Sequence, residues 1–271
     1  MKKFLFTISF MVILTIFFIS ILAFINESSK ERIANNLEMQ RYKSILYAFN
    51  ILPDNVDENR LPSTSTINDI FWDEEKIEEN FKKQIKKIRL PITPDQQKLL
   101  KNSFLSWKDS VDIFFQINKK GEIVAYGFPL KGKGLWGTIT AFGVVSADFK
   151  KMVGIDFIEQ VETPGLGARI IESEFKYFFR NLDLSGFQDK PRNLPAVIMV
   201  TKKNKTNIEQ STNSLQAITG ATQTVSGVLA MLNSDLGFYI TVIRDNEHII
   251  TYNLPKVLNL RDGYIGGYIG D

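Results

Sequence analysis

Two threonines that flank a Gly-Ala pair are the residues of this chain best placed to do chemistry. They lie in the segment Thr219-Gly220-Ala221-Thr222, and the run after Thr222 has the apolar spacing of a helix. The first turn of a helix carries unpaired N–H groups and the positive end of the helix dipole, so it attracts phosphate. The Thr222 hydroxyl would lie among the N–H groups of Ala221, Gln223 and Thr224. This proximity allows a phosphate-bearing cofactor to be esterified to Thr222.

The same segment also fits an ordinary helix start. In that interpretation Thr219 or Thr222 is the N-cap, and its side chain accepts a hydrogen bond from the backbone. Val225, Val228 and Leu229 would then simply face the core. The spacing of these residues leaves both interpretations open.

Two glycine-containing stretches upstream carry further candidate site residues. Residues 132–137 read Gly-Lys-Gly-Leu-Trp-Gly, and residues 162–167 read Glu-Thr-Pro-Gly-Leu-Gly. Taken singly, Trp136 is typical of a core or interface residue, and the Thr-Pro-Gly-Leu-Gly run is typical of a turn. A lone Glu162 fits a solvated or ion-paired side chain equally well. Only the ordered combination with the Thr-Gly-Ala-Thr segment favours a cofactor pocket.

The order and spacing of the three motifs resemble those of the FMN-binding domains in the C subunits of the sodium-translocating NADH:quinone reductases and the G subunits of the related Rnf complexes. The resemblance extends over about residues 111–244. The Gly-Leu-Trp element is typical of the sodium-pump protein, whereas both families share the Glu-Thr-Pro-Gly-Leu-Gly element. Their attachment motif is Asp-x-x-(Ser/Thr)-Gly-Ala-Thr, whose last threonine carries FMN through a phosphoester bond. The resemblance thus implies FMN esterified to Thr222, with Gln216 in place of the family's acidic residue.

The resemblance also implies which residues surround each part of the flavin. Thr222 would hold the phosphate, apolar side chains would form a slot for the ring, and glycines would let the main chain approach it. Glu162 and Thr163 would position the ribityl hydroxyls or the ring carbonyls. No catalytic residue and no metal ligand is expected. The expected cofactor-binding residues are Gly134, Leu135, Trp136, Glu162, Thr163, Gly165, Leu166, Gly167, Thr219, Gly220, Ala221, Thr222, Gln223 and Thr224.

The composition excludes several other redox groups. The 271 residues contain no cysteine and a single histidine, His248. A structural disulfide, a thiolate zinc site, a Cys-ligated iron–sulfur cluster and a bis-His haem are therefore excluded. The net charge of only +3, without a basic stripe, argues against a nucleic-acid partner. If electrons pass through this chain, an organic cofactor must carry them.

The N-terminal segment predicts a membrane anchor. Residues 4–25 carry no charge, and as a helix they would be roughly 33 Å long, enough to cross a hydrocarbon core of about 30 Å. The apolar region of a cleaved signal peptide is usually shorter and ends in small residues, so we expect this segment to be retained. Lys2 and Lys3 precede it and predict a cytoplasmic N-terminus. The rest of the chain would lie on the periplasmic side of a bacterial inner membrane.

The pattern of short apolar runs predicts an α+β fold with a curved antiparallel sheet and helices packed at its ends. We expect a transmembrane anchor over residues 1–29, a helical linker and insertion over 30–110, the FMN-binding domain over 111–245 and a C-terminal extension over 246–271. The expected helices cover residues 31–49, 73–88, 172–181 and 222–232. The expected strands cover residues 111–117, 123–128, 135–145, 152–158 and 196–201. The uncharged near-repeat at 263–270 fits either a docking tail or an unstructured end.

The leading hypothesis is an electron-transfer subunit of a sodium-translocating NADH:quinone reductase that is not catalytic alone. The resemblance implies other membrane subunits as partners and a flavin transferase for maturation. Ion transport would belong to those partners, because one uncharged helix in the lipid offers no path for an ion. One alternative is a flavoprotein like the Rnf G subunits, or a free-standing extracytoplasmic flavoprotein. Another is a membrane-anchored binding or scaffold module without flavin, which Gln216 keeps open.

Overall fold

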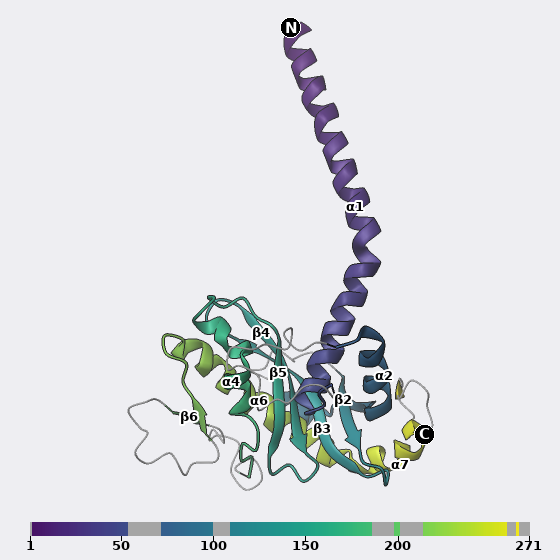
Figure 1. Ribbon diagram of the computed structural model, residues 1–271, viewed down its shortest axis with the longest axis vertical. Helices are drawn as coiled ribbons and strands as arrows, with labels where there is room; N and C mark the ends of the chain where they lie inside the picture. The colour runs from purple at the N-terminus through teal and green to yellow at the C-terminus, as the bar shows by residue number, and fades with distance from the viewer. Residues whose placement is uncertain are drawn as a thin grey trace. The chain divides into compact units, whose positions relative to one another are not determined.

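The computed structural model describes residues 2–53, 72–99, 109–185, 198–200, 214–258 and 264–265 (Figure 1). The chain divides into two compact units, Met1–Arg41 and Tyr42–Asp271. The predicted attachment motif lies wholly within the second unit.

The first unit consists of most of helix α1 (Lys2–Ala48). The apolar side chains between Phe4 and Ile25 are exposed along this helix, as they would be if lipid surrounded them. The hydroxyls of Thr7, Thr15 and Ser20 each donate to the carbonyl four residues earlier. These hydroxyl groups are therefore hydrogen-bonded within the helix and require no water. Among the described helices, α6 (Thr222–Asp245) is also long and apolar enough to span a membrane, but 56% of its apolar window is buried, as in a core helix. The N-terminal apolar helix therefore suits single-pass anchoring.

The second unit is built on a six-stranded sheet with the order β5-β4-β3-β2-β1-β8. Neighbouring strands are antiparallel except β1 and β8, which are parallel. The fold is α+β with an antiparallel sheet, which confirms the predicted class. The strands are β1 (Ile85–Pro91), β2 (Ser110–Ile117), β3 (Ile123–Lys133), β4 (Thr138–Ser146), β5 (Met152–Glu159) and β8 (Tyr264–Ile265).

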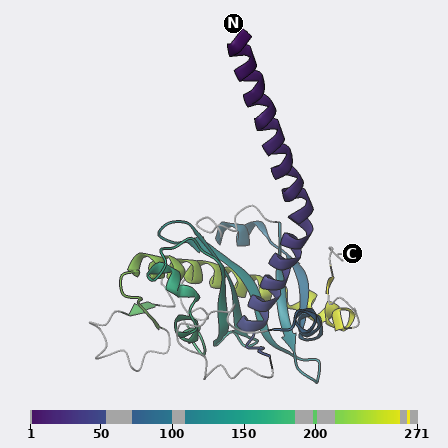
Figure 2. The same ribbon diagram turned by 45° about the horizontal axis from the view of Figure 1, so that its top comes forward.

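The two faces of the sheet are covered by different helices (Figure 2). One face packs against α6, where the ring of Tyr239 stacks on Phe128 of β3 with centroids 4.3 Å apart. The other face packs against the segment after α1, where the ring centroids of Phe49 and of Phe142 in β4 lie 6.1 Å apart. Helix α2 (Glu74–Gln84) also lies on that side, through Phe81. The other elements in the described part of the chain are α3 (Pro94–Leu99), the 3-10 helix η3 (Gly167–Ile171), α4 (Ser173–Tyr177), α7 (Glu247–Leu258) and the parallel pair β6 (Ile198–Val200) and β7 (Ser214–Gln216).

A buried carboxylate fixes α6 against the second half of β3. Strand β2 pairs with β3 only from Ile123 to Gly127, so the later N–H groups of β3 need other partners. The fully buried Asp235 of α6 accepts the N–H of Lys131 at 3.0 Å. This contact holds α6 beside the end of β3 and so beside the hairpin turn that follows.

Several predicted elements have different bounds in the structure. The helix predicted over residues 73–88 ends at Gln84, because the next residues alternate between faces and pair with β2 as strand β1. The sheet therefore includes a strand that the sequence interpretation placed in the linker. The strand predicted over residues 135–145 begins at Thr138, since Gly134 and Gly137 close a turn.

Two predicted helices have other lengths in the structure, and two further predicted segments lie partly outside its described residues. The helix predicted over residues 222–232 continues to Asp245, and the helix predicted over 172–181 is confined to Ser173–Tyr177. Strand β6 lies within the predicted run 196–201, whose other residues are outside the described part. Of the C-terminal near-repeat, the structure describes Tyr264 and Ile265, which pair with Lys87 and Ile88 as β8. The remaining residues of this repeat also lie outside the described ranges.

Candidate functional site

The β3–β4 hairpin places an exposed indole at its tip. The N–H of Gly134 donates to the carbonyl of Gly137 at 2.7 Å, so Leu135 and Trp136 form the end of the turn. Both side chains are exposed, Trp136 to 69%. The indole is nevertheless held, because its Nε1–H donates to Oγ1 of Thr163 at 3.0 Å. An oriented yet exposed aromatic face is suited to a flat ligand.

Behind this turn lies the buried carboxylate of Glu162. Its Oε1 accepts the backbone N–H of Trp136 at 3.0 Å, and its Oε2 accepts the hydroxyl of Thr224 at 2.6 Å. Burial raises the pKa of this carboxyl, but hydrogen bonds from the Thr224 hydroxyl and from the backbone of Trp136, Leu135 and Gly137 outweigh burial, so the pKa is lowered. The carboxylate therefore stays ionised and joins the hairpin turn to α6. We call Glu162 with these hydrogen-bond donors the clasp.

Two of the predicted glycines make room for the clasp. A Cβ at Gly134 would overlap Oε1 of Glu162, and a Cβ at Gly167 would lie 2.6 Å from Oγ1 of Thr224. The sequence interpretation expected these glycines to let the main chain approach the flavin ring. In the structure, close packing against Glu162 and Thr224 already requires glycine at both positions.

Two tight turns face each other beside the clasp. The N–H of Leu166 donates to the carbonyl of Thr163 at 3.1 Å around Gly165, which has a φ of +75°. The N–H of Ala221 donates in the same way to Ile218 at 3.0 Å around Gly220, which has a φ of +78°. Both are the pattern of a type II turn, in which the third residue needs a positive φ. A Cβ at Gly220 would lie 3.0 Å from Cδ2 of Leu166, so the turns are in contact.

The start of α6 is open to solvent and carries no side-chain cap within the described part of the chain. Its N-cap residue is Ala221, so the alternative in which Thr219 or Thr222 caps the helix is not what the structure shows. Thr222 is the first helical residue, and Thr219, Thr222 and Gln223 are all exposed. The first N–H groups of a helix have no acceptor within the helix, so this end is a site for an anion.

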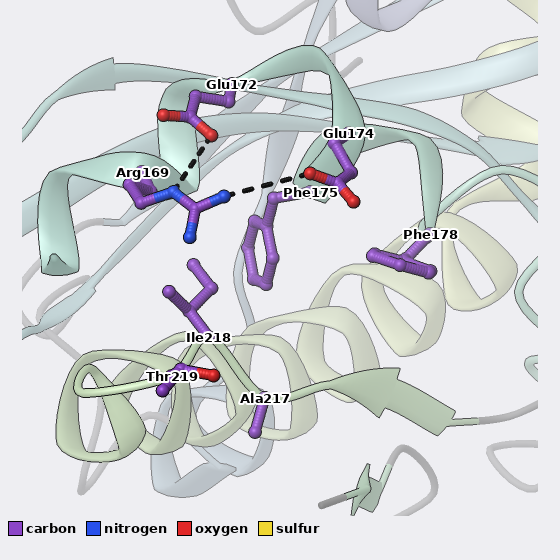
Figure 3. A pocket seen from close by; sticks show the side chains of 8 residues that line it. All are labelled: Arg169, Glu172, Glu174, Phe175, Phe178, Ala217, Ile218 and Thr219. Carbon is purple, nitrogen blue, oxygen red and sulfur yellow. Dashed lines mark hydrogen bonds and ion pairs between the residues drawn. The ribbon is translucent and has the colours of Figure 1, made fainter. Parts of the chain in front are cut away.

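A small cavity borders the same turn (Figure 3). It has a volume of about 180 Å³ and separates η3 and α4 from residues 217–219. Arg169 lies at its edge, where Nε donates to Glu172 at 3.1 Å and a terminal nitrogen lies 3.7 Å from Glu174. Sequence reasoning missed this cavity, since closely spaced opposite charges are typical of a solvated surface. The lining residues are Arg169, Glu172, Glu174, Phe175, Phe178, Ala217, Ile218 and Thr219.

The structure thus brings the three sequence motifs together. The hairpin turn contacts Glu162 and Thr163, Glu162 contacts Thr224, and Leu166 contacts the turn that contains Gly220. Gln216, which replaces the acidic residue of the attachment motif, ends β7 two residues before that turn.

Comparison with known proteins agrees with this geometry. Residues 134–237, which contain all the expected cofactor-binding residues, match the family model described as the FMN-binding domain. The chain is 28% identical over 163 residues to the C subunit of the Na(+)-translocating NADH-quinone reductase of Vibrio campbellii. It is 30% identical over 127 residues to the protein of the same name from Yersinia pestis, which covers 47% of this chain and 45% of that protein. This chain is similar to the C subunits of the Na(+)-translocating NADH-quinone reductases. The resemblance stated from the motifs is confirmed.

Two solved structures of such C subunits have the same fold. The Shewanella oneidensis protein, named NqrC, matches with a TM-score of 0.54 at 21% identity and covers 76% of this chain and 96% of its own. The Parabacteroides distasonis protein matches with a TM-score of 0.54 at 24% identity. This match covers 78% of this chain and 94% of that protein. By sequence, the match to the Vibrio campbellii protein spans 58% of each chain.

The residues of the site fit FMN on structural grounds. The uncapped start of α6 offers N–H groups and an exposed hydroxyl for the phosphate end. The exposed side chains of Leu135, Trp136 and Leu166 offer an apolar surface for the ring. Glu162 is buried and already bonded to the protein, so of the expected pair Glu162–Thr163 only Thr163 is exposed.

Proposed function

We propose that this chain is an electron-transfer subunit of a sodium-translocating NADH:quinone reductase and carries FMN in phosphoester linkage to Thr222. The observation that carries the proposal is the open start of α6, where an exposed threonine stands beside unpaired helix N–H groups and within the matched FMN-binding region. Bound FMN takes up and releases single electrons, which is the chemistry that such a subunit needs.

The geometry favours Thr222 over the other two threonines of the segment. Thr224 is 1% exposed and donates its hydroxyl to Glu162, so its oxygen is not accessible to an incoming phosphate. Thr219 is exposed but precedes the helix, outside its first turn. Thr222 alone among the three combines exposure with a place in the first turn of α6.

The other residues of the site surround the ring and the phosphate. Leu135, Trp136 and Leu166 contact the ring, and Thr163 orients Trp136. The N–H groups of Gln223 and Thr224 lie near the phosphate. The N–H of Ala221, which the sequence also assigned there, is instead donated to Ile218 and closes the turn that contains Thr219 and Gly220. Gly165 gives its own turn the positive φ that brings Leu166 toward Gly220. The FMN-binding domain spans residues 111–245 and shares its sheet with β1.

We also propose a location and partners for the chain. Residues 4–25 of α1 anchor the chain in a bacterial inner membrane, and Lys2 and Lys3 keep its N-terminus in the cytoplasm. The remainder, with the flavin, is periplasmic. Other membrane subunits exchange electrons with the flavin, and a flavin transferase attaches it to Thr222.

In-gel fluorescence of the denatured full-length protein, co-produced with a flavin transferase, tests the proposal. Wild type and Thr219→Ala are expected to fluoresce, and Thr222→Ala is expected to lose the signal. Equal fluorescence of the two variants would refute attachment at Thr222. A wild-type protein that stays dark beside a fluorescent NqrC control would instead support a flavin-free binding module, in line with Gln216 at the position of the acidic residue.

A further inference from the structure

The carboxylate of Glu162 is buried behind the open surface of the site. Glu162 is 5% exposed, and its two oxygens accept hydrogen bonds from Trp136 and Thr224. These donors come from the β3–β4 turn and from the first turn of α6, which are far apart in the sequence. One carboxylate therefore fixes the two segments that carry the proposed ring contact and the proposed attachment residue.

The residue next to Glu162 in the sequence holds the side chain of Trp136. Thr163, the residue after Glu162, accepts the indole N–H of Trp136 at 3.0 Å. Consecutive residues thus hold the backbone and the side chain of the same tryptophan. An indole that is 69% exposed would otherwise sample several rotamers.

We propose that Glu162 is the positioning residue of the flavin site, and that its buried negative charge lowers the reduction potential of the flavin held at the Trp136 turn. This inference rests on the proposed function. Reduction transfers one electron from a neighbouring membrane protein of the complex to the flavin and so adds negative charge to the site. A fixed anion in a poorly solvated position disfavours that added charge, because little water screens the repulsion.

Glu162 differs in burial from Glu159, an acidic residue close to it in the sequence. Glu159 ends β5 only three residues earlier, but its side chain is exposed. Solvent screens an exposed carboxylate, so its effect on the flavin is small. Glu159→Gln is therefore a control that removes the same charge from a neighbouring place.

Two variants separate the charge from the hydrogen bonds. Glu162→Gln keeps the shape of the side chain and an oxygen acceptor but removes the charge. Thr224→Val removes the hydroxyl that donates to Glu162 and leaves the carboxylate in place. Redox titration of the flavin-loaded full-length proteins, with mediators and absorbance as the readout, gives the midpoint potential of each.

We expect the midpoint potential to rise in Glu162→Gln, to stay near the wild-type value in Glu159→Gln, and to change less in Thr224→Val than in Glu162→Gln. A Glu162→Gln potential equal to that of wild type overturns the effect of the charge. An equal shift in Glu159→Gln or in Thr224→Val overturns it as well, since general charge or packing would then explain the shift.

The positioning role has a separate readout that needs no flavin. In protein produced without the transferase, hydrogen exchange of the Trp136 amide reports the bond to Glu162. We expect roughly tenfold faster exchange in Glu162→Gln, because a neutral acceptor binds the N–H less strongly than a carboxylate, and no change in Glu159→Gln. Unchanged exchange in Glu162→Gln overturns the positioning role. Absence of flavin from the wild type instead contradicts the proposed function and leaves this measurement valid.

Discussion

Thr222 and Thr224 stand two residues apart at the start of α6 and face opposite environments. Residues at this spacing project from different sides of a helix, since each residue turns the chain by about 100°. Thr224 is buried and bonded to Glu162, whereas Thr222 is exposed beside unpaired N–H groups. The same residue type thus serves the stability of the site on one side and is available for chemistry on the other. Burial, not the identity of the residue, separates the two roles.

The largest effect is expected where α6 touches the hairpin. A Cβ at Gly227 would overlap the carbonyl oxygen of Lys133, so Gly227→Ala must push α6 away from β3. We expect a loss of about 2–3 kcal/mol in the free energy of unfolding, as for an overpacked core. Alanine in a helix normally stabilises by up to about 1 kcal/mol relative to glycine, so the sign is reversed here.

The exposed neighbour Ser226 provides the control for this prediction. Ser226→Ala is expected to leave stability unchanged or slightly higher, because alanine has the better helix propensity. Urea denaturation of both variants measures the difference. A Gly227→Ala protein at least as stable as wild type would show that α6 and the hairpin are not in the close contact described.

The next largest effect on stability is expected from substitution of Thr224, with Thr222 as its matched control. Thr224→Val leaves Oε2 of the buried Glu162 without its hydroxyl donor, and we expect it to lower the free energy of unfolding by about 1.5–3 kcal/mol. Thr222→Val changes an exposed side chain and should stay within about 0.5 kcal/mol of wild type. Both are compared by denaturation of flavin-free protein. Equal losses in the two variants would remove the contrast between the buried and open sides of the helix.

The clasp should also weaken at low pH. The pKa of Glu162 is lower in the folded protein than its ordinary value of about 4.3, so its ionised form stabilises the fold above that pH. This stabilisation is lost as the pH falls through the lowered pKa of the folded state and the carboxyl takes up a proton. Urea titrations between about pH 6 and pH 3 should show a smaller decline in stability for Glu162→Gln than for wild type. Parallel curves would contradict the lowered pKa.

The smallest effect on stability is expected from the exposed residues of the site. Thr163→Val removes the acceptor of the Trp136 indole, but both side chains are exposed, so stability should change by less than about 0.5 kcal/mol. The indole signal in a proton NMR spectrum should move toward the position of a solvated tryptophan. A large loss of stability would show that Thr163 stabilises the fold as the buried clasp does, which would contradict its description as part of the open surface.

The sequence predicted the fold class and the grouping of the three motifs better than the contacts among their residues. Alternation and turn residues located β2 to β5 because these strands are local hairpins. Strand β1 was missed, since its charged residues follow directly on the similar pattern of α2 and its partner β2 lies beyond α3. Pairing with a distant strand decides such a segment, and spacing within the segment does not show it.

The role of Glu162 could not be predicted for the same reason. Its motif predicted a place near the flavin, but whether its carboxylate faced outward or toward the core depended on Thr224, some sixty residues later. The turns around Gly165 and Gly220 were within reach of the sequence, because each needs a glycine with positive φ. Their mutual contact through Leu166 emerged only from the packing of η3 against α6.

Peptide mass spectrometry of the full-length protein, isolated from cells that contain a flavin transferase, tests the central claim most directly. We expect a flavin phosphoester on the peptide that contains residues 219–224, with fragment ions that assign it to Thr222. An unmodified peptide beside a modified NqrC control, or a flavin on Thr219 or Thr224, would contradict it.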